Sequence, residues 1–430
     1  MTVATSAEVA AAVSAAHRRE WAFVLAAAAR LAPDLGAAEE AVQDAYASAL
    51  ATWGERGIPV SPGAWLTTAA RRRALDLRRR AVVAERALPQ LLPEPDPADD
   101  RGAVPDDRLR LIFTCCHPAL AEEARVALTL RLVCGLSTAD VARAFLVAEP
   151  TMAARITRAK KKVAAACIPY RVPEPDDLPE RLQSVLSVVH LVYTTGHTAP
   201  DGEGLLRRSL SERALELALL LRALLPREPE VAGLLALVLL TDARRPARVD
   251  PDGVPVLLPD QDRDVWDREA IAAGLRALAA AFELGRPGRF TLMAAIAAVH
   301  DEAETWAGTD WRQIRGLYDL LLDVWPSPIV ALNRAVAIGF ADGPAEGLEE
   351  LDRLAAEPVL AGYGYLASAR ADLLTRLGRP TQARAAYEEA LLLTGNAAER
   401  RLLERRLAAL RVVEPSAAAS RSYSGSRRAQ

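Results

Sequence analysis

The stretch GLSTADVARAFLVAEPTMAARITRAKKKV, residues 135–163, decides how the first half of the chain folds. Ser137 stands where a helix N-cap is expected, and Asp140 follows three residues later in the position of a capping box. Pro150 suits the first turn of a second helix, because proline lacks the backbone N–H that would be unsatisfied there. The pattern therefore predicts two helices joined by a short turn, which is a helix-turn-helix.

The second predicted helix has an apolar face and a basic face. Its apolar residues recur at the spacing of one buried stripe, namely Met152, Ile156, Ala159 and Val163. Its polar and basic positions are Thr151, Arg155, Arg158, Lys160, Lys161 and Lys162. The last three are the only lysines of the chain. A helix-turn-helix presents such a face to the major groove of DNA, and a solvated face on an ordinary helical pair is the alternative.

Composition indicates a helical protein of several domains. The chain has 430 residues, of which 51% are hydrophobic and 25% charged, and Ala, Leu and Arg dominate. No apolar run approaches the ~20 residues of a membrane span, and we see no signal peptide. The four cysteines lack a C-x-x-C spacing and favour reduced thiols. We therefore expect a cytoplasmic protein.

Charge is distributed unevenly along the chain. Residues 1–175 carry 23 basic and 20 acidic side chains, whereas residues 176–430 carry 30 and 36. The first part can contact DNA through local patches, and the second part is expected to face protein or small molecules.

Two further charged clusters precede the helix-turn-helix. One lies on a helix that Asp34 can cap, and its polar face carries Glu39, Glu40, Gln43 and Asp44. It is either a solvated face or a docking face for a basic partner. The other lies on a helix expected from about Ala64 and consists of Arg71, Arg72, Arg73, Arg78, Arg79 and Arg80. Guanidinium groups match phosphate oxygens, so this helix is a candidate for DNA contact.

These motifs, in this order, resemble the extracytoplasmic-function group of bacterial sigma factors in the sigma-70 superfamily, over about residues 15–170. The resemblance implies that Glu39, Glu40, Gln43 and Asp44 meet core RNA polymerase. It implies that the six arginines hold the −10 element of promoter DNA and that residues 58–63 lie near a flipped base. It also implies that Thr151, Arg155 and Arg158 face the −35 major groove, with Lys160–Lys162 on its phosphates.

The second half of the chain is expected to be helical from Leu178 onward. Residues 243–267 predict a short hairpin or extended loop with Asp252-Gly253 as its turn, and they resemble the linker of a long sigma subgroup with a helical-repeat extension. Residues 373–396 look like a tetratricopeptide repeat, and residues 331–354 align with them at an offset of 36. A non-repeating helical bundle is the alternative.

We find no catalytic motif. His190, His197 and His300 lie far apart without a nucleophile motif, and Cys115, Cys116 and His117 lack a second ligand pair. We therefore expect no enzyme activity, no cofactor and no metal.

The predicted fold is all-α, with two small helical domains that bind polymerase and DNA, followed by tetratricopeptide-like repeats. Its predicted parts are residues 8–86, a linker at 87–107, the helix-turn-helix domain at 108–170, a helical connection at 176–267, repeats at 268–412 and a disordered tail at 413–430. The predicted function is that of a sigma factor, whose partners are core RNA polymerase and promoter DNA. The repeats would bind a protein partner or the chain's own sigma domains and so regulate it in cis. The alternative is a stand-alone DNA-binding regulator with a repeat-type sensor.

Overall fold

The structure is a computed structural model, and it describes residues 5–86, 106–145, 147–198 and 204–413. Within these ranges the chain is helical and contains no strand, which confirms the all-α prediction. Most of the predicted linker, and the predicted tail from residue 414, lie outside the described residues. No helix in these ranges is long and apolar enough to cross a membrane.

The chain divides into two compact units, the first ending at Val192 and the second beginning at Tyr193. The helices of the first unit are α1 (Ser6–Ala29), α2 (Leu35–Arg56), α3 (Pro62–Arg86), α4 (Asp107–Cys115), α5 (Glu122–Leu128), the π-helical turn η1 (Thr129–Val133), α6 (Thr138–Ala144) and α7 (Glu149–Ala165). Helix α8 (Leu178–His197) begins in the first unit and ends in the second.

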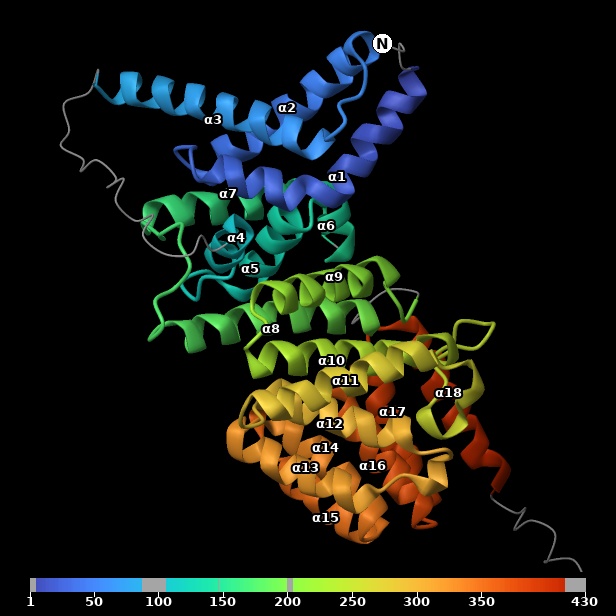
Figure 1. Cartoon of the computed structure of the whole chain (residues 1–430). Coiled ribbons are helices and arrows are strands. Elements are labelled where there is room, and N and C mark those ends of the chain that lie inside the picture. Colours follow the sequence, from blue (N-terminus) through green and yellow to red (C-terminus); the bar gives the residue numbers. More distant parts are fainter. Residues whose placement is uncertain (1–4, 87–105, 146, 199–203, 414–430) are drawn as a thin grey trace, which may run out of the picture. The chain divides into compact units, whose positions relative to one another are not determined.

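Helices α1, α2 and α3 pack on one another and form what we call the N-terminal domain (Figure 1). Asp34 caps α2 as predicted, because its carboxylate accepts a hydrogen bond from the backbone N–H of Ala37 at 2.8 Å. The chain leaves α2 at Gly57, whose φ of 82° favours glycine. Helix α3 begins at Pro62, slightly before the predicted start, since proline is tolerated in the first turn.

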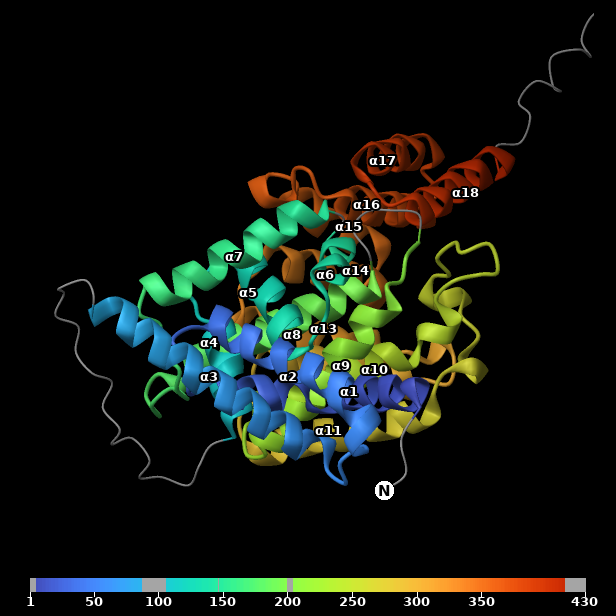
Figure 2. The same cartoon turned by 90° about the horizontal axis from the view of Figure 1, so that it is seen from above.

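Helices α4 to α7 form what we call the helix-turn-helix domain, in which α6 and α7 pack together (Figure 2). The sequence pattern indicates a continuous helix from Glu122 to Cys134. The structure has a continuous helix from Glu122 to Val133, but its last turn, η1, is π-helical, and there the N–H of Cys134 donates to the carbonyl of Thr129 at 3.0 Å. The first half of α8 packs beside this domain, and Arg181 donates to the carbonyl of Phe113 at 2.7 Å.

The second unit is built around α10, which is apolar on nearly every side and packs against α9, α11 and α12. Its helices are α9 (Arg208–Leu224), α10 (Pro229–Ala243), α11 (Arg268–Leu284), α12 (Arg289–Glu302), α13 (Trp311–Val324), α14 (Pro328–Ala341), α15 (Pro344–Leu354), α16 (Gly364–Arg376), α17 (Pro380–Leu393) and α18 (Ala397–Val413). Short 3₁₀ turns add η2 (Arg245–Ala247), η3 (Leu258–Asp260), η4 (Arg263–Val265), η5 (Trp306–Gly308) and η6 (Pro358–Leu360).

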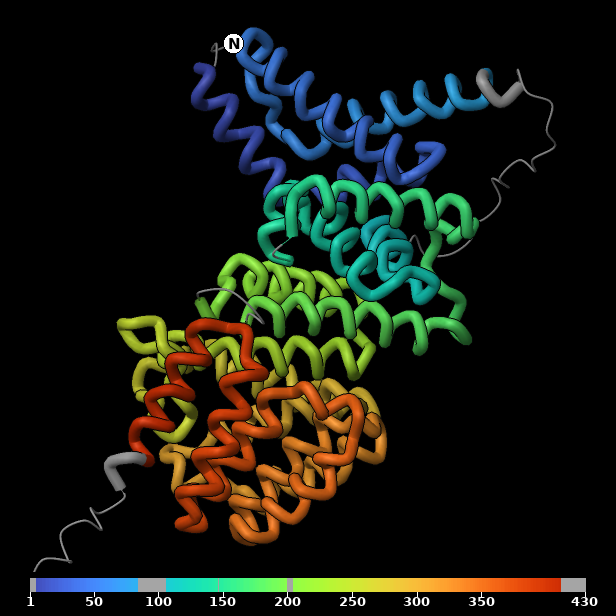
Figure 3. The backbone as a smooth tube through the Cα atoms, turned by 180° about the vertical axis from the view of Figure 1, so that it is seen from behind, coloured from blue at the N-terminus to red at the C-terminus, as the bar shows by residue number. Residues whose placement is uncertain are grey.

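From α12 to α18 each helix packs against the next one in the chain, so the tube passes back and forth (Figure 3). The two aligned segments of the predicted repeat fall on α14–α15 and α16–α17. Gly347 lets α15 approach α14 closely, because a Cβ there would lie 2.6 Å from the Cα of Gly339. The order of packing agrees with stacked helical hairpins, and the assignment to the tetratricopeptide class stays a prediction.

The segment before α11 is an extended loop with one tight turn. Gly253 has a φ of 74°, and its N–H donates to the carbonyl of Asp250 at 2.9 Å. A single isolated bridge, between Val249 and Pro255, is all the strand pairing that the described part of this segment makes. Arg405 of α18 holds the Asp250 carboxylate at 2.6 Å. The N–H of Asp250 also donates to the carbonyl of Val254 at 2.9 Å, and the N–H of Val256 donates to the carbonyl of Arg248 at 2.8 Å. Both predicted alternatives are therefore present, because a short hairpin turns at Asp252-Gly253 within a longer extended loop.

Candidate nucleic-acid interface

The start of α6 confirms the capping box that the sequence predicts. The Ser137 hydroxyl accepts a hydrogen bond from the N–H of Asp140 at 3.0 Å, and the Asp140 carboxylate accepts one from the N–H of Ser137 at 3.3 Å. The Ser137 hydroxyl also bonds that carboxylate at 2.6 Å, which holds the pKa of Asp140 below its ordinary value. The turn that positions α7 is thus fixed by local chemistry.

Helix α7 separates its faces as expected. The four apolar residues of the predicted stripe are all buried, and they are Met152, Ile156, Ala159 and Val163. Among the predicted −35 residues, Thr151, Arg158, Lys161 and Lys162 are exposed and Arg155 is half-buried. These side chains remain accessible to the phosphates and base edges of a major groove. Lys160 is different, because it lies against the N-terminal domain.

The arginine-rich face of α3 is largely open. Arg71, Arg72 and the run Arg78–Arg80 are exposed. Arg73 instead bonds two acidic side chains of α2, because its guanidinium donates to Asp44 at 2.6 Å and to Glu40 at 3.2 Å. One predicted DNA contact is therefore occupied by two predicted polymerase contacts, all within the N-terminal domain.

The loop between α2 and α3 exposes apolar side chains. Val60 is fully exposed and Ile58 is 37% exposed. Behind the loop, the rings of Trp53 and Trp65 pack edge to face with centroids 5.5 Å apart, which anchors the two helices that carry it. An exposed apolar loop beside an arginine-rich helix is suited to contact an unstacked base.

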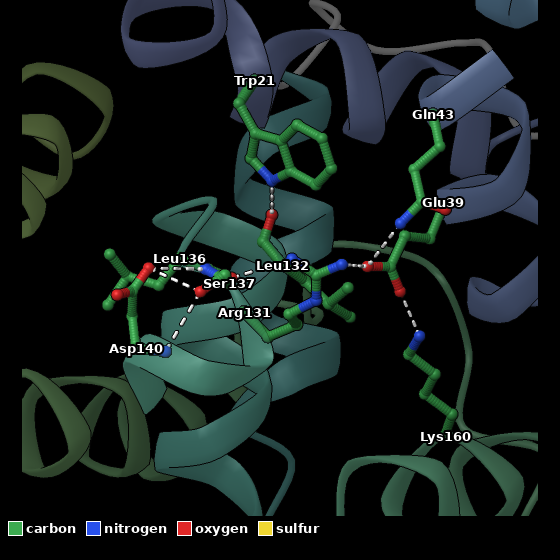
Figure 4. Close-up of polar contacts among 9 residues, drawn as sticks. All are labelled: Trp21, Glu39, Gln43, Arg131, Leu132, Leu136, Ser137, Asp140 and Lys160. Carbon is green, nitrogen blue, oxygen red and sulfur yellow. Dashed lines mark hydrogen bonds and ion pairs between the residues drawn. The ribbon is translucent and has the colours of Figure 1, made fainter. Parts of the chain in front are cut away.

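The predicted acidic face of α2 is not uniform. Glu40 and Asp44 have side chains that are about half exposed, and Gln43 is exposed. Glu39 is only 5% exposed, and its carboxylate forms ion pairs with Arg131 of η1 and Lys160 of α7 (Figure 4). The structure thus joins a predicted polymerase contact to a predicted DNA contact.

Sequence reasoning missed the residues that join the two domains. The indole N–H of Trp21 in α1 donates to the carbonyl of Leu132 in η1 at 3.0 Å (Figure 4). Gly135 lies directly under this ring, since a Cβ there would come within 2.8 Å of the Trp21 Cγ. The Tyr170 hydroxyl donates to the carbonyl of Ala26 at 2.9 Å. The sequence signal that could have pointed to this contact is Gly135, because a glycine just after the end of a helix often adopts a positive φ.

Among the described residues, no group of three or more His, Cys, Asp or Glu side chains is placed to hold a metal ion. Cys115 and Cys116 are buried, and burial raises the pKa of the Cys116 thiol to about 11. Such thiols behave as small apolar side chains of the core.

Comparison with known proteins places two family regions on the two domains just described. Sigma-70 region 2 matches residues 17–82, and Sigma-70 region 4 matches residues 110–163. A family of unknown function (DUF6596) matches residues 181–282.

A comparison over most of the chain extends the match into the second unit. The chain is similar to an uncharacterized protein of Rhizobium meliloti (strain 1021), with 43% identity over 375 residues, which cover 85% of this chain and 88% of the relative. Regions 2 and 4 occur here in order, on a three-helix domain and a helix-turn-helix domain, each with an exposed basic helix. The chain belongs to the sigma-70 family.

Proposed function

We propose that this protein directs core RNA polymerase to specific promoters and initiates transcription, as an extracytoplasmic-function sigma factor. The observation that carries the proposal is the presence of both sigma-70 regions, each on a helical domain with an open basic helix. Two separate DNA contacts on one chain fit a factor that reads two promoter elements. Its place of action would be the cytoplasm, where core polymerase and promoter DNA are found.

In this proposal each charged face has its own partner. Helix α3 contacts the −10 element through Arg71–Arg73 and Arg78–Arg80. Helix α7 contacts the −35 element through Thr151, Arg155, Arg158 and Lys160–Lys162. The acidic face of α2 binds core polymerase through Glu39, Glu40, Gln43 and Asp44. Exposed arginines at phosphates would make DNA binding strongly dependent on salt.

The test is run-off transcription with core polymerase and a promoter selected by the protein itself. Glu40→Gln combined with Asp44→Asn should lower core binding and transcription while DNA binding persists. Glu55→Gln is the matched control, because Glu55 is an exposed acidic residue at the other end of α2. Absence of core binding and transcripts with the unaltered protein would refute the proposal. Sequence-specific DNA binding without core binding would instead favour a stand-alone regulator.

We further propose that the second unit, with its helical hairpins, regulates the sigma domains in cis or binds a protein partner. Stacked hairpins offer broad surfaces for protein contact. The chain ending at Val192 keeps the part of α8 whose Arg181 contacts Phe113, so it is the truncation to compare with the full chain. Equal transcription by both, with both folded by circular dichroism, would contradict the proposed regulation.

A further inference from the structure

A groove in the first unit runs between α1 and α2, and Arg131 of η1 contributes to its lining. Its volume is about 620 Å³, which is a typical size for a small-molecule site in a protein. The lining residues lie between positions 13 and 21 of α1 and between positions 43 and 50 of α2. They recur about one helical turn apart, so each helix presents one face to the groove.

The buried part of the lining is aromatic. Trp21 and Tyr46 are 5% and 8% exposed, their ring centres lie 6.0 Å apart, and the ring of His17 lies 4.8 Å from that of Trp21. The indole N–H of Trp21 donates to the carbonyl of Leu132 (Figure 4). The hydroxyl of Tyr46 donates to the carbonyl of Ala16 at 3.5 Å. Because both polar groups already have partners, these rings offer the groove apolar surface.

The apolar surface continues onto aliphatic side chains that solvent reaches. Leu50 of α2 is 53% exposed, and Ala47, one turn earlier on the same helix, is exposed as well. Val13 of α1 adds a buried aliphatic side chain to the lining. A ligand with an apolar body would cover Leu50 and the rings together, and the removal of this surface from water would favour binding.

The charged side chains of the lining are those of two arginines, Arg18 and Arg131, and no described carboxylate lines the groove. The Arg131 guanidinium is already occupied, because it pairs with Glu39 and donates to the carbonyl of Leu136. Arg18 is exposed, and within the part of the chain that the structure describes it forms no hydrogen bond or ion pair. Its planar guanidinium matches the two oxygens of a carboxylate.

We propose that this groove binds a small amphipathic carboxylate. Its apolar body lies on Trp21, Tyr46 and Leu50, and its carboxylate pairs with Arg18. The two arginines favour an anion over a neutral or cationic molecule, whereas the apolar lining favours a hydrocarbon or aromatic body over a sugar. The groove would give the chain a response to a metabolite, and this inference is independent of the proposed function.

The test is titration calorimetry of the full chain with octanoate and with indole-3-propionate. These probes carry the same anionic group on an aliphatic and on an aromatic body. We expect at least one of them to bind with a Kd below about 1 mM. The corresponding amides, octanamide and indole-3-propionamide, keep the body but lose the charge. They should bind roughly three- to tenfold more weakly, because a hydrogen bond to a charged group is stronger than one between neutral groups.

Two variants with matched controls locate the site. Arg18→Gln should weaken binding of the acids roughly three- to tenfold and leave the amides unaffected, whereas Arg19→Gln, at an exposed arginine outside the groove, should change neither. Ala47→Trp should fill the groove and abolish binding of acids and amides alike. Ala51→Trp, at the exposed position one turn further along α2 and outside the lining, should bind like the unaltered chain. Circular dichroism checks that each variant is folded.

Each contrary result overturns a defined part of the proposal. If the folded full chain binds neither acid, the groove is not a carboxylate site. Equal affinities for acids and amides, or unchanged affinities for the acids in Arg18→Gln, would overturn recognition of the carboxylate. Unchanged affinity in Ala47→Trp would place the binding elsewhere and overturn the assignment to this groove.

Discussion

Replacing Gly135 by alanine is expected to weaken the contact between the two domains of the first unit, and the structure indicates by how much. Gly135 has a φ of 69°, a conformation that costs a side-chain-bearing residue about 1–2 kcal/mol. The added Cβ would also lie 2.8 Å from the Trp21 Cγ and 3.2 Å from the His17 Cε1. Overpacking of this kind costs about 1–3 kcal/mol. The total expected loss is therefore about 2–5 kcal/mol.

Hydrogen exchange of the full chain measures this loss where it occurs. The reporting amides are those of Cys134 and Leu136, which bond the carbonyls of Thr129 and Leu130 at 3.0 and 3.1 Å. Their local opening free energy should fall by the amount given above. Because the chain has two compact units, a single global unfolding transition would not isolate the effect.

Repeating the Gly135→Ala substitution in a Trp21→Ala protein separates the conformational cost from the packing cost. In Trp21→Ala the 2.8 Å contact is gone and only the 3.2 Å approach to the His17 Cε1 remains, so Gly135→Ala should then cost little more than the conformational part, about 1–2 kcal/mol. Gly378→Ala is the matched control, because Gly378 has a φ of 66° and no atom within 4 Å of an added Cβ. If Gly135→Ala costs the same within about 0.5 kcal/mol with and without Trp21, the packing of the indole on Gly135 is refuted.

Three other predictions address DNA contact, pH and packing. Arg155→Ala should weaken binding to the preferred promoter by about 1–3 kcal/mol and relax its specificity, while Lys161→Ala should weaken all DNA alike and reduce the salt slope by about one, as measured by anisotropy titrations. Since the pKa of Asp140 is lowered in the folded state, its contribution is present above its unfolded pKa and is lost as pH falls through its folded pKa. Asp140→Asn should therefore flatten the acid side of the stability profile, and an unchanged profile would contradict this. Gly347→Ala should lower the melting temperature because its Cβ meets backbone, whereas Gly316→Ala, with open space in α13, should leave it equal or higher.

Local signals in the sequence predicted local structure well. The Ser137 cap and the stripe containing Met152 depend only on residues within one or two helical turns, and both are confirmed. The helix predicted from Glu122 to Cys134 is continuous from Glu122 to Val133, but its last turn is π-helical, and a π-helical turn gives no sign in apolar periodicity. The stacking of α12 to α18 followed from hydrophobic helices joined by short turns, although repeat class is not set by packing order alone.

Contacts between distant residues could not be read from the sequence. Glu39 and Lys160 are 121 positions apart, and Arg73 is 29 positions from Asp44. Each residue type was correctly placed on a polar helix face, but a polar face does not state whether it meets solvent, a partner or another part of the same chain. The pairing of Glu39 with Arg131 needed the fold of both domains, because Arg131 lies in η1, a π-helical turn that the sequence pattern did not predict.

These pairings change the expected electrostatics of polymerase binding. By sequence alone, the acidic face of α2 has three carboxylates that a basic partner could bind, namely those of Glu39, Glu40 and Asp44. In the free protein all three already bond cations of the same chain, through Arg73, Arg131 and Lys160. Binding that exchanges ion pairs gains less Coulomb energy than binding that creates them. Affinity for core should therefore depend on salt less steeply than three free carboxylates would require. Arg131→Gln should steepen that dependence, because Glu39 then pairs with Lys160 alone.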